Sequence, residues 1–162
     1  SGTGQHSVFF AEQLPHLQWH TSDRAINHEG INLWHCEANL TNLHAPLELD
    51  LNNEWPVDKV DAIYTANTFH IVSWQLVERF FDGVKRHLNS DGMLCIYGPF
   101  KYQGEFTSPS NDDFSAFLTE RDPLSGIRDF EAVEQLAKQA GLTLISDTAM
   151  PANNQLLVFK RQ

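Results

Sequence analysis

The stretch VDAIYTANTF, residues 60–69, decides the fold class together with the two segments that follow it. β-Branched and aromatic side chains dominate its core, which is typical of a buried strand. The next segment, SWQLVERFFDGVKRHL at residues 73–88, has apolar side chains at helical spacing and begins with Ser73 as a candidate N-cap. MLCIYG, residues 93–98, is nearly all apolar, as expected of a parallel strand covered on both faces. Strand, crossover helix and strand together predict a parallel α/β sheet.

The segments on either side continue this alternation. Toward the N-terminus we expect a short helix (6–15), a strand that ends at Asp23 (17–23), a helix interrupted near Gly30 (24–40) and a strand that ends at Asp50 (46–50). Toward the C-terminus we expect a turn that ends the helix (89–92), a long loop (99–111), two helices (112–121 and 130–141) and a hairpin of two strands (142–150 and 154–161). The sequence therefore predicts a mostly parallel sheet with helices on both faces, closed by an antiparallel hairpin.

Length and composition predict one globular domain over residues 1–162. The chain is 41% hydrophobic and 20% charged, which suffices for a sizeable core. No apolar run approaches the roughly 18 residues that span a bilayer, and no secretory signal stands at the start. We therefore expect a cytoplasmic protein with no membrane partner. Cys36 and Cys95 have no metal or disulfide spacing, which indicates core thiols.

The charge balance argues against nucleic acid as a partner. The chain has 11 basic residues and a formal net charge of -10. A protein that grips nucleic acid needs clustered Lys and Arg to displace the counterions of the phosphates. The acidic balance instead suits a small neutral or cationic ligand.

The eight histidines do not predict a metal site. His16 and His20 are four residues apart, but they lie on the approach to a strand, where that spacing does not converge. His28 and His35 are two helical turns apart, about 10 Å. We predict no bound metal.

Three features gather at the predicted ligand crevice, which in an open α/β sheet lies beyond the carboxyl ends of the strands. They are a loop with Gly2 and Gly4, Asp23 after one strand, and Asp50 after the next. A carboxylate at a strand end can accept both hydroxyls of a ribose, and one at this distance from the loop suits NAD equally well. Asp50 suits an adenine amino group. A flexible tail for the glycines, a helix cap for Asp23 and a turn for Asp50 remain open.

The chain resembles the class I S-adenosylmethionine-dependent methyltransferases, and more narrowly the group that includes methyltransferase-like protein 26. The resemblance covers the whole chain and is carried by SGTGQH (1–6), LQWHTSD (17–23), PLELD (46–50), TANTFHI (65–71), YGPF (97–100), SPSN (108–111), RDPLSGIRD (121–129) and MPANNQLLVFKR (150–161). It implies a Rossmann-like sheet with the C-terminal antiparallel hairpin, and S-adenosyl-L-methionine as the cofactor. The implied cofactor-binding residues are Gly2, Thr3, Gly4, Asp23, Asp50, Leu51 and Asn67.

The same resemblance places Asn67 at the end of a strand beside the sulfonium. Asn67 either aligns the methyl acceptor through its carbonyl oxygen or shapes the strand end. His70 is the nearest titratable residue that could remove a proton from the acceptor, and a helix-entry histidine is the alternative. We take Asn67 and His70 as the catalytic candidates.

Four further residues are candidates for substrate contacts: Tyr97, Asn111, Arg128 and Asn153. The hairpin turn that contains Asn153 and Asn154 lies on the crevice side if the strand before it is parallel to the main sheet, so both could contact the substrate. Asn in such a turn is also selected for its backbone. Arg128, like Arg121, either binds an acidic group on the acceptor or pairs with Asp122, Asp129 or Glu120.

The family's first strand, which enters the glycine loop and occupies the middle of the sheet, is absent before Ser1. We expect the chain to be an N-terminally truncated fragment. A homo-oligomer is one way to compensate for the buried strand.

These observations predict a methyltransferase that acts on a small molecule or a protein. A non-catalytic binding or assembly module on the same fold is the alternative. An NAD-dependent oxidoreductase is a third interpretation, although its fingerprint has Gly where Ser7 stands and has no use for Asp50.

Overall fold

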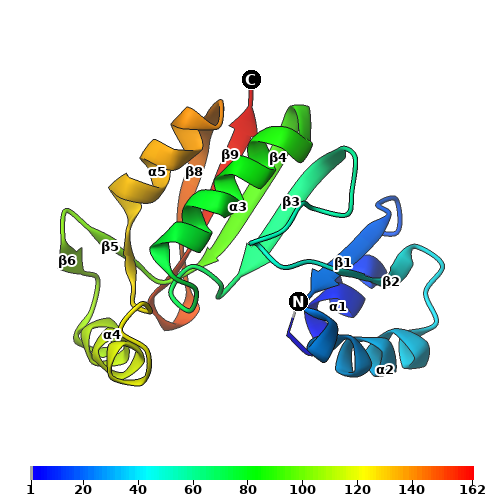
Figure 1. Cartoon of the computed structure of the whole chain (residues 1–162), viewed down its shortest axis with the longest axis horizontal. Helices are drawn as coiled ribbons and strands as arrows, with labels where there is room; N and C mark the ends of the chain where they lie inside the picture. Colours follow the sequence, from blue (N-terminus) through cyan, green and yellow to red (C-terminus); the bar gives the residue numbers. More distant parts are fainter. Residues whose placement is uncertain (1) are drawn as a thin grey trace. The chain divides into compact units, whose positions relative to one another are not determined.

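The computed structural model describes residues 2–162, which divide into two compact units, Ser1–Pro56 and Val57–Gln162 (Figure 1). The first unit contains α1 (Gln5–Gln13), β1 (Trp19–Asp23), η1 (Ala25–Asn27), α2 (His28–Ala38) and β2 (Leu43–Glu48). The second contains β3 (Val60–Ala66), α3 (Trp74–His87), β4 (Leu88–Gly98), β5 (Phe100–Tyr102), β6 (Glu105–Phe106), α4 (Pro109–Arg121), β7 (Arg128–Asp129), α5 (Phe130–Gln139), β8 (Leu142–Met150), η2 (Pro151–Asn153) and β9 (Asn154–Arg161). The prediction of a single domain stays a prediction.

The first unit has a parallel two-stranded sheet, in which Asp23 of β1 lies opposite Glu48 of β2. Asn42, just before β2, fixes the chain between α1 and β1. Its buried side-chain amide donates to the carbonyl oxygens of Ala11, Leu14 and Leu17 at 2.9, 3.4 and 3.1 Å. The bond to Ala11 satisfies a carbonyl in the last turn of α1 that has no intrahelical partner.

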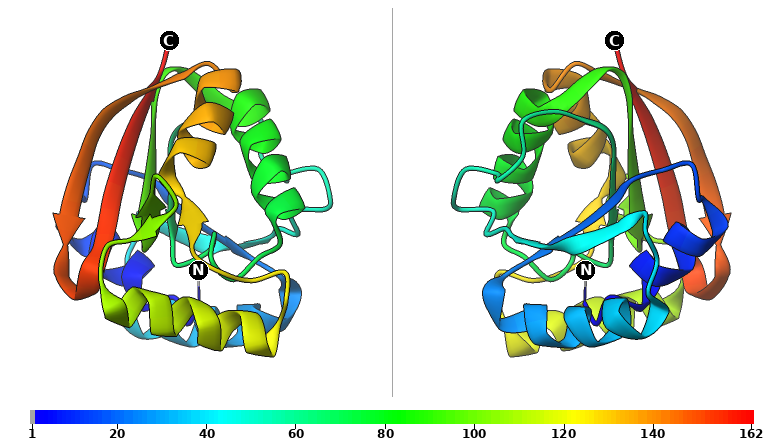
Figure 2. Two further views of the ribbon diagram at one scale, coloured as in Figure 1. Left: turned by 90° about the vertical axis from the view of Figure 1, so that its left-hand side faces the viewer. Right: turned by 90° about the vertical axis from the view of Figure 1, so that its right-hand side faces the viewer.

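The second unit has a four-stranded sheet in the order β3-β4-β9-β8. β3 and β4 are parallel, and β9 is antiparallel to both β4 and β8. The strand β8 therefore runs parallel to β4, so the turn after it lies at the carboxyl edge of β3 and β4, as predicted. Both α3 and α5 cover one face of this sheet (Figures 1 and 2).

A fully buried apolar layer holds this sheet and its helices together. Its members are Val77 and Val84 of α3, Leu94 and Ile96 of β4, Val133 and Ala137 of α5, and Leu157 and Phe159 of β9. A smaller sheet, in the order β6-β5-β7, leads into α4 and α5.

Several element boundaries differ from the sequence prediction. Residues 89–92 do not form a turn that ends α3, because they lie inside β4. The register between β3 and β4 shifts between Val60 and Ala62, and Asp91 adopts a positive φ of 62°. The pairing is irregular here, because Val60 and Ala62 of β3 lie opposite Leu88 and Met93 of β4, and the turn-forming residues fall between these two pairs. Gly92 is required there, because an added Cβ would lie 2.8 Å from the carbonyl oxygen of Asn89.

The predicted long loop at residues 99–111 is also wrong. It contains β5 and β6, joined through Gln103 and Gly104, both with positive φ. α4 then begins at Pro109, where Ser108 is the N-cap and accepts from the Asn111 N–H. Such short strands carry too few residues to show a period of two.

Three further boundaries need correction. The break in the 24–40 helix lies between η1 and α2, and Gly30 sits inside α2. β2 covers Leu43–Glu48, so Asp50 lies beyond the strand. β3 ends at Ala66, because Asn67 has a left-handed φ of 54° that breaks the extended backbone.

Candidate functional site

In the first unit, three distant segments meet at the carboxyl end of β1. The Gly2 N–H donates to Oδ2 of Asp23 at 3.1 Å. The Leu49 N–H donates to the main-chain oxygen of Asp23 at 2.9 Å, which places Asp50 next to the same strand end. The convergence of the glycine loop, Asp23 and the segment at Asp50 agrees with the sequence prediction.

Both carboxylates also have local structural contacts. Oδ1 of Asp23 accepts from the Arg24 N–H at 2.8 Å and from the Asn27 amide at 2.7 Å, at the start of η1. Oδ1 of Asp50 accepts from the main-chain N–H and the side-chain amide of Asn52 at 2.8 and 3.0 Å. Asp50 thus has the turn contact of the alternative interpretation, whereas Asp23 contacts Arg24 and Asn27 without capping the helix, and these bonds fix Oδ1 of each carboxylate.

Gly2 and Gly4 differ in their surroundings. Both have positive φ, 55° and 93°. A Cβ on Gly2 would meet nothing within 4 Å, whereas one on Gly4 would lie 3.1 Å from the Cα of Ile31 in α2. Gly4 is thus required for close packing between α1 and α2, and the open space lies over Gly2.

Replacing Gly4 with alanine is expected to destabilise the protein by about 1–3 kcal/mol, because it adds strain at a positive φ and a contact with backbone. Gly30→Ala is the matched control. Gly30 lies inside α2 with no atom within 4 Å of an added Cβ, so the change should stabilise by about 0.5–1 kcal/mol. Chemical denaturation of both variants measures the difference. A Gly4→Ala variant as stable as wild type would contradict this packing role.

In the second unit, Asn67 and His70 lie at the carboxyl end of β3. The Asn67 N–H donates to the Tyr97 carbonyl oxygen at 2.8 Å, which anchors the strand end. Its side chain is exposed, while His70 is only 5% exposed. The His70 ring meets Phe114 of α4 edge to face, with the ring centroids 5.5 Å apart.

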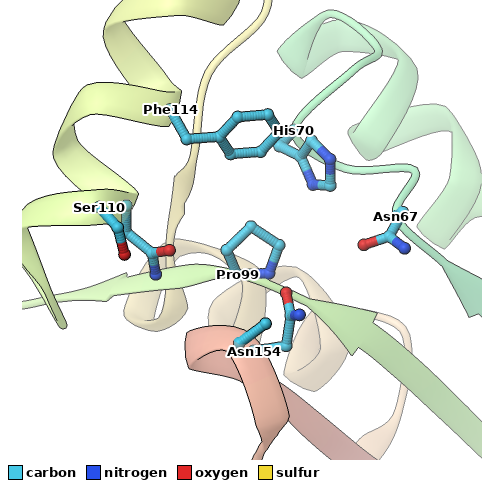
Figure 3. Close-up of a pocket in the computed structure, with 8 residues that line it drawn as sticks. Asn67, His70, Pro99, Ser110, Phe114 and Asn154 are labelled. Atoms are coloured by element: carbon cyan, nitrogen blue, oxygen red, sulfur yellow. The ribbon is translucent and has the colours of Figure 1, made fainter.

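These residues line a pocket of about 370 Å³ that lies wholly within the second unit (Figure 3). Its lining consists of Asn67, His70, Pro99, Ser110, Asn111, Phe114, Ala152 and Asn154. The structure therefore brings together Asn67, His70, Asn111 and Asn154 of the predicted residues. Tyr97 and Asn153 are not among the lining residues but contact two of them. The Tyr97 hydroxyl accepts from the Asn154 amide at 3.2 Å, and the Asn153 amide donates to the Ser110 hydroxyl at 3.1 Å.

Sequence reasoning missed Pro99, Ser110, Phe114 and Ala152 as pocket residues. Pro99 and Ser110 fell in the segment predicted as a long loop. Phe114 lies on a helix with no clear apolar face. Its exposed fraction of 37%, high for a large apolar side chain, becomes visible only in the structure.

Arg128 has a different environment from the one predicted. Its Nε donates to the Phe69 carbonyl at 2.9 Å, and its Nη2 donates to the carbonyls of Val72 and Leu124, each at 2.6 Å. The guanidinium thus ties the segment that follows β3 to the segment before β7. Arg128 is not among the residues that line the pocket.

Burial, followed by the nearby positive charge of Arg128, lowers the pKa of His70 from 6.5 to about 4. His70 is therefore neutral near pH 7. A neutral imidazole has one nitrogen that can accept a proton and one that donates.

The lowered pKa of His70 predicts an acid-dependent loss of stability. Between the ordinary pKa and about 4, the unfolded chain binds a proton that the folded chain does not, so stability falls as the pH falls. The loss attributable to His70 should be about 2 kcal/mol between about pH 7 and pH 5. A His70→Gln variant should show a correspondingly flatter pH dependence in denaturant unfolding. Identical slopes in the two proteins would contradict the lowered pKa.

Three histidines outside the pocket have structural contacts. Nε2 of His35 lies 2.9 Å from the buried hydroxyl of Ser7, and the His20 and His44 rings stack across β1 and β2. Within residues 2–162, no three or more His, Cys, Asp or Glu side chains gather as metal ligands would.

Cys36 is exposed and Cys95 is half-buried, so the prediction of two core thiols is wrong for Cys36. None of the helices described for this part of the chain has the length and apolar composition that a bilayer crossing requires.

Solved methyltransferases share this fold over nearly the whole chain. An O-methyltransferase family protein from Burkholderia thailandensis matches 99% of the chain with a TM-score of 0.87 at 14% identity. CalO1, a methyltransferase in calicheamicin biosynthesis solved with SAH bound, matches 99% with a TM-score of 0.82 at 17% identity. An O-methyltransferase family 2 protein from Planctomyces limnophilus DSM 3776, in complex with apigenin, matches 100% with a TM-score of 0.82 at 16% identity. The chain thus has the Rossmann-like methyltransferase fold.

The chain spans about half the length of these solved proteins: 48%, 46% and 49% in the same order. A family described as "Protein of unknown function (DUF938)" matches residues 1–161. The chain belongs to this family.

Proposed function

We propose that the protein is an S-adenosyl-L-methionine-dependent methyltransferase that acts on a small-molecule or protein acceptor. The observation that carries the proposal is the meeting of Gly2, Asp23 and the segment at Asp50 at one strand end, on a fold similar to that of an SAH-bound methyltransferase. The narrower grouping with methyltransferase-like protein 26 remains a proposal based on the sequence.

The residues of the first unit offer the chemical groups that an adenosine needs. Asp23 offers carboxylate oxygens for ribose hydroxyls, and Asp50 with Leu51 offers an acceptor and an apolar side chain for adenine. The open space over Gly2 leaves room for a ligand against the backbone of Gly2 and Thr3. Once bound, S-adenosyl-L-methionine would supply a methyl group made electrophilic by its sulfonium.

The residues of the second unit fit the acceptor side of the reaction. Methyl transfer forms a bond from an acceptor N or O to the methyl carbon and breaks the methyl–sulfur bond, and the acceptor then loses a proton. His70 is neutral and buried in the pocket wall, and its free ring nitrogen can take that proton and pass it to water. Asn67, exposed beside the pocket, can orient the acceptor.

Calorimetric titration of the intact protein with S-adenosylhomocysteine tests the proposal. NAD is the comparison ligand. Saturable binding of S-adenosylhomocysteine at one site per chain, and no binding of NAD, is the expected result. Binding of NAD alone would indicate an oxidoreductase. Binding of neither ligand would indicate a non-catalytic module on the same fold.

A further inference from the structure

The pocket in the second unit is lined by uncharged polar and apolar side chains. None of the residues that line it is Asp, Glu, Lys or Arg. The nearby guanidinium of Arg128 is occupied by three main-chain carbonyls. A charged ligand would lose part of its hydration there without contacting an oppositely charged side chain of the lining, which disfavours its binding. The pocket therefore favours an uncharged ligand.

Asn111 presents an oxygen whose direction is fixed. The side chain is 5% exposed, and its Nδ2 donates to the Thr107 hydroxyl at 2.9 Å and to the Asn153 carbonyl at 3.0 Å. A carbonyl can only accept, so the amide cannot be flipped without losing this bond. Both N–H groups are thereby used, and Oδ1 is left to accept from a ligand.

Asn154 repeats this arrangement from the other side of the pocket. Its Nδ2 donates to the Pro151 carbonyl and to the Tyr97 hydroxyl, each at 3.2 Å. Figure 3 shows its Oδ1 turned toward the space beside Pro99. Two amide oxygens from distant segments are therefore available to the same ligand.

The remaining wall is aromatic and apolar. Phe114 and Pro99 supply its flat surfaces, and the neutral ring of His70 stands edge to face with Phe114. No hydrogen bond to a nitrogen of the His70 ring occurs in the described part of the chain, although the residue is 5% exposed. A planar ligand with its N–H groups on one edge would satisfy both amide oxygens and pack its ring against Phe114.

We propose that this pocket binds an uncharged aromatic amine through the amide oxygens of Asn111 and Asn154. Its role as the methyl acceptor rests on the proposed function, but the recognition itself does not. The pocket volume of about 370 Å³ is in the range of small-molecule sites.

The test is a titration of the intact protein with aniline, benzoate and protonated benzylamine, observed by NMR through the side-chain amide signals of the asparagines. Aniline should shift the signals of Asn111 and Asn154 saturably, and the two ions should bind at least 10-fold more weakly. Benzoate or benzylammonium binding as tightly as aniline would overturn the proposal, as would no binding of aniline.

Asn154→Leu is the primary variant, because Asn154 is half-buried and its two bonds within the protein are 3.2 Å long, whereas Asn111 is buried and its two bonds are shorter, at 2.9 and 3.0 Å. Loss of one ligand hydrogen bond should weaken aniline binding about 10-fold. Gln135→Leu, an exposed amide on α5, is the matched control and should leave binding unchanged. Equal affinity in Asn154→Leu and Gln135→Leu would overturn the assigned contact.

The same sample is titrated with S-adenosylhomocysteine. Binding of S-adenosylhomocysteine without aniline overturns the amine pocket and leaves the proposed function standing. Binding of aniline without S-adenosylhomocysteine overturns the proposed function and leaves the amine pocket standing.

Discussion

Replacing Asp23 with alanine is expected to weaken the binding of S-adenosylhomocysteine by about 100-fold or more. In the proposed site the Asp23 carboxylate, oriented by Asn27 and the Arg24 N–H, accepts both ribose hydroxyls. Each hydrogen bond to a charged acceptor contributes about 1.5–3 kcal/mol, and 1.4 kcal/mol corresponds to a factor of ten. Calorimetric titration of the intact variant measures the loss.

Two control variants separate binding from folding. Asp23→Asn keeps an oxygen that can accept from Asn27 and the Arg24 N–H, so it should fold like wild type and still bind the ligand more weakly. Glu37→Ala removes an exposed carboxylate from α2 in the same unit and should bind normally. An Asp23→Ala protein that is folded and binds within about 3-fold of wild type would refute the ribose role, given the size of such bonds.

Arg128→Gln is expected to lower the free energy of unfolding by about 3–5 kcal/mol, because it leaves the carbonyls of Phe69, Val72 and Leu124 without their charged donor. Removing the positive charge should also raise the pKa of His70 above its present value of about 4. Denaturant unfolding measures the first effect, and NMR titration of the His70 ring measures the second.

Arg128→Lys distinguishes the two effects. It keeps the positive charge but not the planar guanidinium, so it should lower the free energy of unfolding nearly as much as Arg128→Gln does. The pKa of His70 should stay low. Arg121→Gln is the matched control, since Arg121 lies at the end of α4 with its guanidinium over the Phe117 ring. Arg121→Gln should lower the free energy of unfolding by no more than about 1 kcal/mol. If Arg121→Gln and Arg128→Gln are equally destabilising, Arg128 does not hold these segments together.

The parts of the fold that the sequence predicted are those with long periodic segments. The spacing of Val77, Val84 and the other apolar residues of α3 specifies a helix, and the apolar run of β4 specifies a buried strand. Two strand segments joined by the turn PANN (151–154) predicted the hairpin. The positions of Asp23 and Asp50 at neighbouring strand ends follow from the same reasoning, because parallel strands present their carboxyl ends at one edge.

The parts that it missed depend on tertiary contacts. Nothing in the local sequence shows that Arg128 meets carbonyls more than fifty positions away, or that the Asn111 amide meets the Asn153 carbonyl. Residues 89–92 have the composition of a turn, so the sequence did not indicate that they belong to β4. β5 and β6 are too short for a periodic pattern. Of the residues that line the pocket, the sequence therefore indicated Asn67, His70, Asn111 and Asn154.

The central claim is that Asp23 and the segment at Asp50 hold an adenosine. A crystal structure of the intact protein grown with S-adenosylhomocysteine tests it most directly. The account predicts the ribose hydroxyls within hydrogen-bond distance of the Asp23 carboxylate, with the adenine against Asp50 and Leu51. A ligand bound elsewhere, with both carboxylates in contact only with their own backbone and side-chain neighbours, would contradict it.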